Sequence, residues 1–451
     1  MSKTDPPTIE LRSHGWSPVE HTTSKLHRVF TAEPGLMHSI NWHIPAPGEP
    51  AFEHCHAWVN APSGQPDASA IGVGGTALTR EVALAKAIGE AVERYCGSVY
   101  DVDSIRVASC AKLGERAVDP RRFVLFHDSQ YEHGLGLNRV DESSELGWSA
   151  GYSLTKNRPA WIPASIVHTG YQGLGTGEPF ELAPVSGYAC GNTLEEALLG
   201  GICEVVERDA FMLHWYQRLP SANIDLRTLQ SSEAQDTLAR YRDCPVRLFC
   251  ADITTDVGIP AVAAVMTSRH PQWPAAVVAA ASSLDPERAA VRALQELASN
   301  HLYVRDCANA RTNNLPTRPE QVTGMEEHGL LYTTPQWLTQ LGPLLRPDEW
   351  RSLDADAGLR TDDVKIAVEH CVAKLDAAGL EVLFVDLTTP EVEALGLKVV
   401  KVLIPGMQPM DFGLSWQHLG GRRLYEVPER LGHKDWAESP DQLNTFPHPF
   451  P

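Results

Sequence analysis

The sequence predicts an α/β protein, in which helices pack on sheets of mixed strands. Two segments, 77–98 and 192–215, carry mostly apolar residues at helical spacing. Three short runs, at 245–252, 260–267 and 275–282, have the length and composition of strands. Long helices and apolar strands in one chain are typical of an α/β fold.

The elements that lie before and after these segments follow in chain order. Residues 1–70 are rich in Pro and His and lack a long period, so we expect an irregular segment with short strands. Residues 173–178 are a glycine-rich loop, either a surface turn or a lid over phosphate. A helix is predicted over 285–306, with Asp285 as N-cap and Pro286 at the first position.

The last third of the chain is less regular. Residues 311–361 are polar and contain Pro and Gly, which predicts an excursion on the surface. After it we expect a helix at 363–378 and strands at 380–387 and 397–404.

Composition and charge exclude several classes of function. The chain has 451 residues, with 38 Lys and Arg against 57 Asp and Glu, and its net charge of −19 argues against a general nucleic-acid binder. Its apolar stretches, such as 273–282, are far shorter than the ~20 residues that span a bilayer. Residues 1–15 lack the apolar core of a secretory signal. We therefore expect a cytoplasmic protein without a membrane partner.

Cysteine usage agrees with a reducing compartment. None of the nine cysteines falls in a C-x-x-C pair, which removes the usual zinc and redox signatures. The triplet His54, Cys55 and His56 could suggest a metal site. Successive strand residues point to opposite faces, however, so Cys55 cannot easily join both histidines at one ion, and ordinary packing is the expected role.

An internal repeat is the strongest signal in the sequence. Residues 79–94, TREVALAKAIGEAVER, align without a gap with residues 193–208, TLEEALLGGICEVVER. Thr79 and Thr193 stand where helix N-caps would lie. Short internal repeats often mark duplicated units that pack against each other.

Both copies of the repeat end in Glu-x-x-Glu-Arg, and these positions share one helix face. The residues are Glu90, Glu93 and Arg94 in the first copy and Glu204, Glu207 and Arg208 in the second. One such motif alone is most often a solvated ion pair. Two copies on apolar helices instead predict buried carboxylates, which must be paired or bind metal. Four carboxylates against two arginines leave a surplus that Mg²⁺, with its oxygen ligands and substrate phosphates, would satisfy.

Four segments together resemble the YcaO superfamily, in its azoline-forming cyclodehydratase branch of thiazole/oxazole-modified microcin biosynthesis. They are 72–95, 186–210, VVKVLIPGMQPMDFG at 399–413 and PHPFP at 447–451. The resemblance implies a YcaO-type fold, with a catalytic domain at 71–446 and a proline-rich tail at 447–451. It also implies an ATP site without a P-loop, and the chain contains no Gly-Lys pair.

The resemblance further implies which residues hold ATP and Mg²⁺. The ATP-binding set is Glu90, Glu93, Asn192, Glu196, Glu204, Glu207 and Arg208, and all five glutamates of this set are expected metal ligands. Arg208 is also an expected catalytic clamp for phosphate or a glutamate. Two departures stand out: Thr76 replaces a lysine that the family often carries, and Glu296 corresponds only in part to a Glu-x-x-Gln motif.

The reaction that the resemblance implies is ATP-dependent cyclodehydration in ribosomally synthesised and post-translationally modified peptide (RiPP) biosynthesis. A Cys, Ser or Thr side chain of a precursor peptide attacks the preceding amide carbonyl. The amide oxygen then takes the γ-phosphoryl group, and phosphate leaves to give thiazoline or (methyl)oxazoline. A thioamide- or amidine-forming enzyme and a non-catalytic ATP-binding scaffold subunit remain open. The kinase-like triplet Asp411-Phe412-Gly413 lacks the other kinase motifs and is ascribed to chance.

The end of the chain and the partners complete the expectations. Pro447, Pro449 and Pro451 alternate, which favours a stiff polyproline II rod that would place the Pro451 carboxylate as a catalytic base or orienting group. A disordered tail is the alternative. Residues 1–70 are too few for a ubiquitin-activating-enzyme-like leader-binding domain, so a separate partner protein is expected. A flavin-dependent dehydrogenase and a homodimer are further expected partners.

Overall fold

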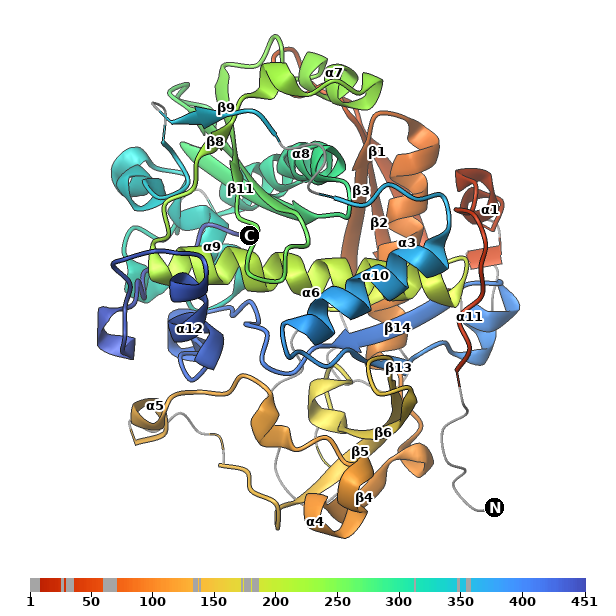
Figure 1. Cartoon of the computed structure of the whole chain (residues 1–451). Coiled ribbons are helices and arrows are strands. Elements are labelled where there is room, and N and C mark those ends of the chain that lie inside the picture. The colour runs from red at the N-terminus through yellow and green to blue at the C-terminus, as the bar shows by residue number, and fades with distance from the viewer. Residues whose placement is uncertain are drawn as a thin grey trace.

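Three β-sheets surround two long helices, α3 and α6 (Figure 1). The computed structural model describes residues 9–25, 28–29, 36–59, 71–132, 137, 139–171, 173, 180, 186–311, 314–346, 349–353 and 358–451. This arrangement is the predicted α/β class, with sheets that are antiparallel except where β12 runs parallel to β8. Within the described ranges, no helix is long and apolar enough to cross a membrane.

The strands form a three-stranded, a five-stranded and a six-stranded sheet. The first contains β1 (Met37–His43), β2 (Glu53–Val59) and β3 (Ile71–Ala77). The second has the order β11 (Ala276–Ser282), β10 (Ala261–Ser268), β9 (Val246–Asp252), β8 (Asn223–Ile224) and β12 (Trp350–Arg351). The third has the order β4 (Arg106–Ser109), β5 (Glu145–Ser153), β13 (Leu383–Asp386), β14 (Lys398–Leu403) and β7 (Tyr188–Gly191), with β6 (Arg158–Pro163) paired to β5.

The longest helices pack on these sheets or, for α10, on α6. They are α3 (Arg80–Ser98), α6 (Leu194–Gln217), α8 (Pro286–Ala310) and α10 (Val364–Ala377). Helix α6 crosses the centre of the molecule, with β10 and β11 on one side and β7 and β14 on the other (Figure 1). The shorter helices are α1 (Val19–Thr23), α4 (Cys110–Leu113), α5 (Asp128–Glu132), α7 (Ser232–Ala239), α9 (Met325–Leu331), α11 (Pro390–Ala394) and α12 (Arg422–Arg430).

Each copy of the internal repeat forms a helix, and a strand comes directly before each one. The resulting strand–helix units are β3–α3 and β7–α6. The predicted N-caps are confirmed: the Thr79 hydroxyl accepts from the Val82 amide at 3.4 Å, and the Thr193 hydroxyl from the Glu196 amide at 3.2 Å. Gly75 lets α3 approach β3 closely, because a Cβ there would lie 2.0 Å from the Ala83 carbonyl oxygen. Helix α3 also packs on β7, so the two copies share an interface.

Most elements lie where the sequence predicts them, with one correction. The segment 311–361 is not only a surface excursion, because Leu331, Tyr332 and Leu341 are completely buried in a cluster with α6 and the chain end. Strands β4 to β8 carry no strong periodic signal and were not expected. All but residue 173 of the loop 173–178 lies outside the described residues.

The His54-Cys55-His56 triplet packs as expected from strand geometry. Cys55 is fully buried, whereas His54 and His56 lie on the opposite face of β2, with their Nε2 atoms 2.9 Å apart. All nine cysteines are free thiols.

Candidate nucleotide and magnesium site

The two Glu-x-x-Glu-Arg motifs meet in one chamber between α3 and α6. Burial is the main cause that raises the pKa values of Glu93 and Glu207, and nearby charges add to it: those of Glu204 and Glu90 for Glu93, and that of Glu204 for Glu207. The four carboxylates that the sequence singles out are therefore neighbours in space. We call this space the carboxylate chamber, lined by Glu90, Glu93, Glu204 and Glu207.

Backbone amides position these carboxylates in a repeated pattern. Glu90 accepts from the Gly74 amide at 2.9 Å, and its counterpart Glu204 accepts from the Gly187 amide at 3.0 Å. Glu93 reaches across to the other copy and accepts from the Cys190 amide at 2.7 Å. Each strand thus orients the carboxylates, and one of these bonds ties the two copies together.

The chamber is enclosed by protein but reachable by a small ligand. The side chains of Glu90, Glu204 and Glu207 keep 34%, 29% and 12% of their surface exposed. The carboxylates that the sequence predicts to be buried are therefore partly exposed, Glu207 least of the three. Partly exposed carboxylates of this kind suit a ligand that brings its own charge.

Desolvation dominates the electrostatics of the chamber. It raises the pKa of Glu93 and that of Glu207 to about 8, and it raises the pKa of Glu90. The arginines offset only part of this effect: Arg94 lies 3.5 Å from Glu90, and Arg208 lies 3.4 Å from Glu207 and 3.8 Å from Glu204. A cation that enters the chamber would therefore favour the charged forms of these carboxyl groups.

The donor set fits Mg²⁺ that arrives with phosphate. In the part of the chain that the structure describes, no three acidic, His or Cys side chains form a ready-made metal cage. Mg²⁺ rarely uses such cages, since it keeps water and binds through one or two carboxylates plus substrate phosphates. Enclosed glutamate oxygens with too few cations match that mode of binding.

Helix α8 adds residues that the sequence did not assign clearly. The charge of Glu296 raises the pKa values of both Glu90 and Glu207, so Glu296 faces the chamber. Lys86 of α3 donates to the Thr76 carbonyl oxygen at 2.8 Å and to Gln295 at 3.3 Å. Lys86 thus lies beside Thr76, the position at which the family often carries a lysine. The sequence signal for Lys86 is a lysine within the apolar stretch ALAKAI.

Asn192 and Glu196 lie at the start of α6, apart from the four chamber carboxylates. Glu196 accepts from the amides of Ser17 and Asn192 at 2.6 and 2.9 Å, and Lys25 donates to the Asn192 side chain at 2.6 Å. Glu196 also lines a cavity of about 310 Å³ with Arg288. The predicted metal role of Glu196 stays a prediction.

Arg208 connects the chamber to the end of the chain. Its guanidinium lies 4.4 Å from the centre of the Phe450 ring and 3.6 Å from the Met410 sulfur. The tail is docked and not a disordered end: the Trp215 indole donates to the Phe446 carbonyl at 2.8 Å, and the Tyr332 hydroxyl to the Pro447 carbonyl at 2.7 Å.

Two stacked histidines hold the tail in place. His328 and His448 stack with ring centres 3.9 Å apart. The Gly413 amide donates to His328 Nε2, so His328 Nδ1 carries the proton that binds the His448 carbonyl. His448 Nε2 in turn donates to the Asp411 carbonyl at 2.7 Å. Both rings are neutral, and burial lowers their pKa values.

The comparisons with known proteins agree with this geometry. The model of the family described as YcaO cyclodehydratase, ATP- and Mg²⁺-binding, matches residues 74–408. The chain belongs to the YcaO family, whose model covers most of its length.

Three relatives illustrate the placement. An uncharacterised protein of Methanothermobacter thermautotrophicus is 28% identical over 77% of this chain and 84% of its own length. A heterocyclase solved in complex with substrate and cofactor is 28% identical, with a TM-score of 0.81 over 98% of this chain and 59% of the other. The heterocyclase TruD is 26% identical, with a TM-score of 0.70 over 98% of this chain and 56% of the other. The chain thus spans less than three-fifths of the length of each heterocyclase.

The raised pKa values predict that Mg–ATP binding releases protons. Glu93 and Glu207, with pKa values of about 8, hold protons at pH 7, and a cation favours their charged forms. Apparent affinity should therefore rise as pH increases from 7 towards 9. Titration calorimetry at pH 7 in buffers of different ionisation enthalpy should detect proton release that is absent at pH 9. Affinity that does not change with pH, without proton release, would contradict this electrostatic description.

Proposed function

We propose that this chain is an ATP-dependent cyclodehydratase that converts Cys, Ser or Thr residues of a ribosomally made precursor peptide into thiazolines or (methyl)oxazolines. The carboxylate chamber is the observation that carries the proposal. Membership of the YcaO family and the likeness to two heterocyclases support it.

In this proposal the chamber binds the phosphates of ATP. Glu90, Glu93, Glu204 and Glu207 would hold Mg²⁺, which when bound neutralises charge on the transferring phosphoryl group. Arg208 lies at the edge of the chamber and would hold a phosphate oxygen or orient Glu207, 3.4 Å away. Lys86 would supply a second positive charge from α3.

The cavity of about 310 Å³ beside the chamber is the proposed place of the nucleoside. Leu199, Leu284 and Leu359 give it apolar walls, while Arg288 and Arg292 lie on the side of α8. The charge of Glu207 acts on Arg292, so the cavity adjoins the chamber. A nucleotide could therefore place its base among the leucines and its phosphates among the glutamates.

The chemical step is then one of positioning. The nucleophile of the peptide loses its proton as it bonds to the carbonyl carbon of the preceding residue, and the former amide oxygen takes the γ-phosphoryl group, which leaves ADP. Loss of phosphate and of the amide proton forms the C=N bond of the azoline. The chain contributes orientation and charge complementarity, which are the main means of phosphoryl-transfer catalysis.

Removing one chamber charge should abolish most turnover without harming the fold. In Glu93→Gln the amide oxygen can still accept from Cys190, and in Glu207→Gln the shape is kept. ATP-dependent processing should fall by ~10²-fold or more. The melting temperature should not fall, because Gln has the shape of the neutral carboxyl group that each glutamate carries at pH 7. Wild-type ATP turnover in both variants would show that the site is elsewhere. Glu81→Gln, an exposed change in the first turn of α3, is the matched control.

Product analysis separates this function from the alternatives. Mass spectrometry of the peptide after incubation with Mg–ATP should detect loss of one water for each azoline. Exchange of oxygen for sulfur would indicate a thioamide-forming enzyme, and water loss with closure onto an amine would indicate an amidine. ATP binding without any product would indicate a scaffold subunit.

The docked tail is proposed to act in the chemical step. Phe450 packs on Arg208, and Pro451 follows it against Gly329 of α9. The carboxylate of Pro451 is the group that the sequence assigns to this step. Its role as a base or orienting group remains the prediction made from the sequence.

A C-terminal extension tests that role. Adding four or so glycines and serines after Pro451 keeps every side chain but moves the carboxylate. Cyclodehydration should fall by ~10²-fold or more, the scale of a lost acid–base group. ATP affinity and melting temperature should stay near wild type. An extended protein with full activity would mean that the tail only packs.

Leader recognition is proposed to require a separate ubiquitin-activating-enzyme-like protein. The match to the heterocyclase solved with substrate covers 59% of that chain, so two-fifths of it has no counterpart in these residues. In titrations with leader peptide, the purified chain should bind weakly, and adding the partner should restore tight binding. Tight binding by the chain alone would refute the proposal. A dehydrogenase and a homodimer remain expectations.

A further inference from the structure

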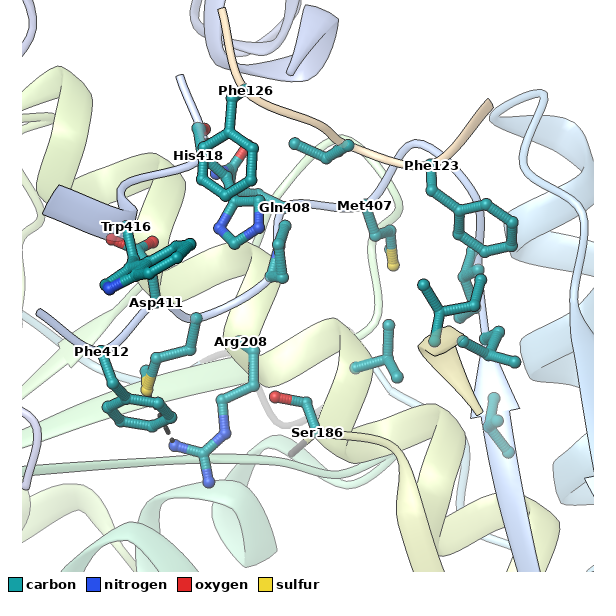
Figure 2. Close-up of a pocket in the computed structure, with 18 residues that line it drawn as sticks. Phe123, Phe126, Ser186, Arg208, Met407, Gln408, Asp411, Phe412, Trp416 and His418 are labelled. Carbon is teal, nitrogen blue, oxygen red and sulfur yellow. Dashed lines mark hydrogen bonds between the residues drawn. The ribbon is translucent and has the colours of Figure 1, made fainter. Parts of the chain in front are cut away.

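A second cavity lies on the far side of Arg208 from the carboxylate chamber, and it measures about 290 Å³ (Figure 2). Its floor is the end of β14 and the loop after it, including Ile404, Met407 and Met410. Phe126, Trp416 and His418 gather on one side, and Phe123 stands opposite (Figure 2). We call this space the aromatic cavity. Nothing in the proposed phosphate chemistry uses it.

The walls of the aromatic cavity are fixed by packing and hydrogen bonds. Phe126 stacks on His418 with ring centres 4.6 Å apart and meets Trp416 edge-on at 6.3 Å. The floor is tied to α6, because buried Asp209 accepts from the Gln408 amide at 2.8 Å. Asp209 also pairs with buried Arg423 at 2.7 Å. The cavity is therefore preformed, as ligand sites usually are.

One turn of α6 separates the aromatic cavity from the carboxylate chamber. Val205 and Arg208 line the cavity, while Glu204 and Glu207, their neighbours in sequence, line the chamber. The Arg208 guanidinium touches both spaces, at 3.4 Å from Glu207 and 3.6 Å from the Met410 sulfur, which is the dashed contact in Figure 2. A group held in the cavity therefore lies beside the phosphoryl-transfer site.

The chemistry of the lining selects an apolar occupant. Among the described residues that line the cavity, the charged side chains are Arg208 and Asp411. Asp411 already accepts two contacts from the Tyr216 hydroxyl, at 2.7 and 3.0 Å. One arginine shared with two glutamates does not make a second phosphate site. A volume near the lower end of the ~300–1,000 Å³ range of ligand sites fits one large side chain better than a folded partner.

We propose that the aromatic cavity binds the side chain of the substrate residue that immediately precedes the cyclised Cys, Ser or Thr, with preference for aromatic or large aliphatic side chains. This inference rests on the proposed function. The carbonyl that is attacked belongs to that preceding residue, so its Cα is bonded directly to the reacting carbon. When the amide oxygen points to the phosphate in the carboxylate chamber, the side chain of the preceding residue is the one that would extend past Arg208 into the aromatic cavity.

Blocked dipeptides test the order of residues as well as their chemistry. The probes are acetyl-Phe-Ser-amide, acetyl-Asp-Ser-amide and the reversed acetyl-Ser-Phe-amide, each titrated by NMR against the full chain with Mg²⁺ and a non-hydrolysable ATP analogue. Acetyl-Phe-Ser-amide should bind ~10- to 100-fold more tightly than the other two, the scale of burying one aromatic side chain. Equal binding of all three would overturn the proposal.

Variants of the cavity wall assign the binding to this place. Trp416→Ala should weaken acetyl-Phe-Ser-amide by ~10-fold, and Trp416→Phe should restore most of it. Affinity for the ATP analogue should stay unchanged in both variants. The matched control is Trp58→Ala, at an exposed position in the first sheet. Wild-type dipeptide binding by Trp416→Ala would overturn the assignment even if the preference for Phe exists.

A processing assay separates this inference from the proposed function. Precursor peptides with Phe or Asp before one Cys are incubated with the chain, its leader-binding partner and Mg–ATP. Faster azoline formation after Phe, with the difference lost in Trp416→Ala, supports both proposals. Equal rates after Phe and Asp would refute the cavity while the cyclodehydratase stands. Selective binding of acetyl-Phe-Ser-amide without any azoline would refute the cyclodehydratase while the cavity stands.

Discussion

Carboxyl groups held close together in an enclosed chamber are the constraint on which the rest of this structure depends. Four glutamates from two helices converge beside Arg94 and Arg208, and desolvation raises the pKa values of Glu93 and Glu207 to about 8. Such an arrangement costs stability unless a ligand supplies positive charge. Proteins retain strained electrostatics of this kind mainly where function uses it.

Much of the surrounding architecture serves to hold these carboxylates in place. The two strand–helix repeats give each first glutamate a backbone amide, and the Cys190 amide ties Glu93 to the other repeat. Because β3 and β7 belong to different sheets, the chamber also joins two of the three sheets. A site built across sheets in this way is positioned by the whole fold and not by one loop. Arg208 links the chamber to two neighbouring parts of the protein. It contacts Phe450 on the tail and Met410 in the lining of the aromatic cavity.

Local signals made the chamber predictable from the sequence. The repeat places Glu90, Glu93, Glu204 and Glu207 on helix faces, and capping threonines mark where each helix begins. The helices and the strands β9 to β11 have strong periodicity, and their bounds differ from the predicted ones by only a few residues. These properties depend on nearby residues, which a sequence displays directly.

Features that depend on contacts between distant residues were not predictable. The docking of the tail needs His328 and His448 to stack, and these residues lie far apart in the chain. Leu331 lies in a segment that is polar in sequence, and its burial becomes visible only from its packing in a cluster with residues of α6. The aromatic cavity combines Phe126 with Trp416, which no periodic pattern connects. Glu296 has only a partial motif in the sequence, and its effect on the chamber glutamates depends on how α8 packs.

The most direct test of the central claim is a crystal structure of the protein with Mn²⁺ in place of Mg²⁺ and a non-hydrolysable ATP analogue. The account predicts anomalous peaks for Mn²⁺ between α3 and α6, in contact with oxygens of the chamber glutamates and of the triphosphate. It also predicts the base in the cavity lined by Leu199 and Arg288. Nucleotide bound elsewhere, or a chamber that stays free of metal while nucleotide is bound, would contradict the account.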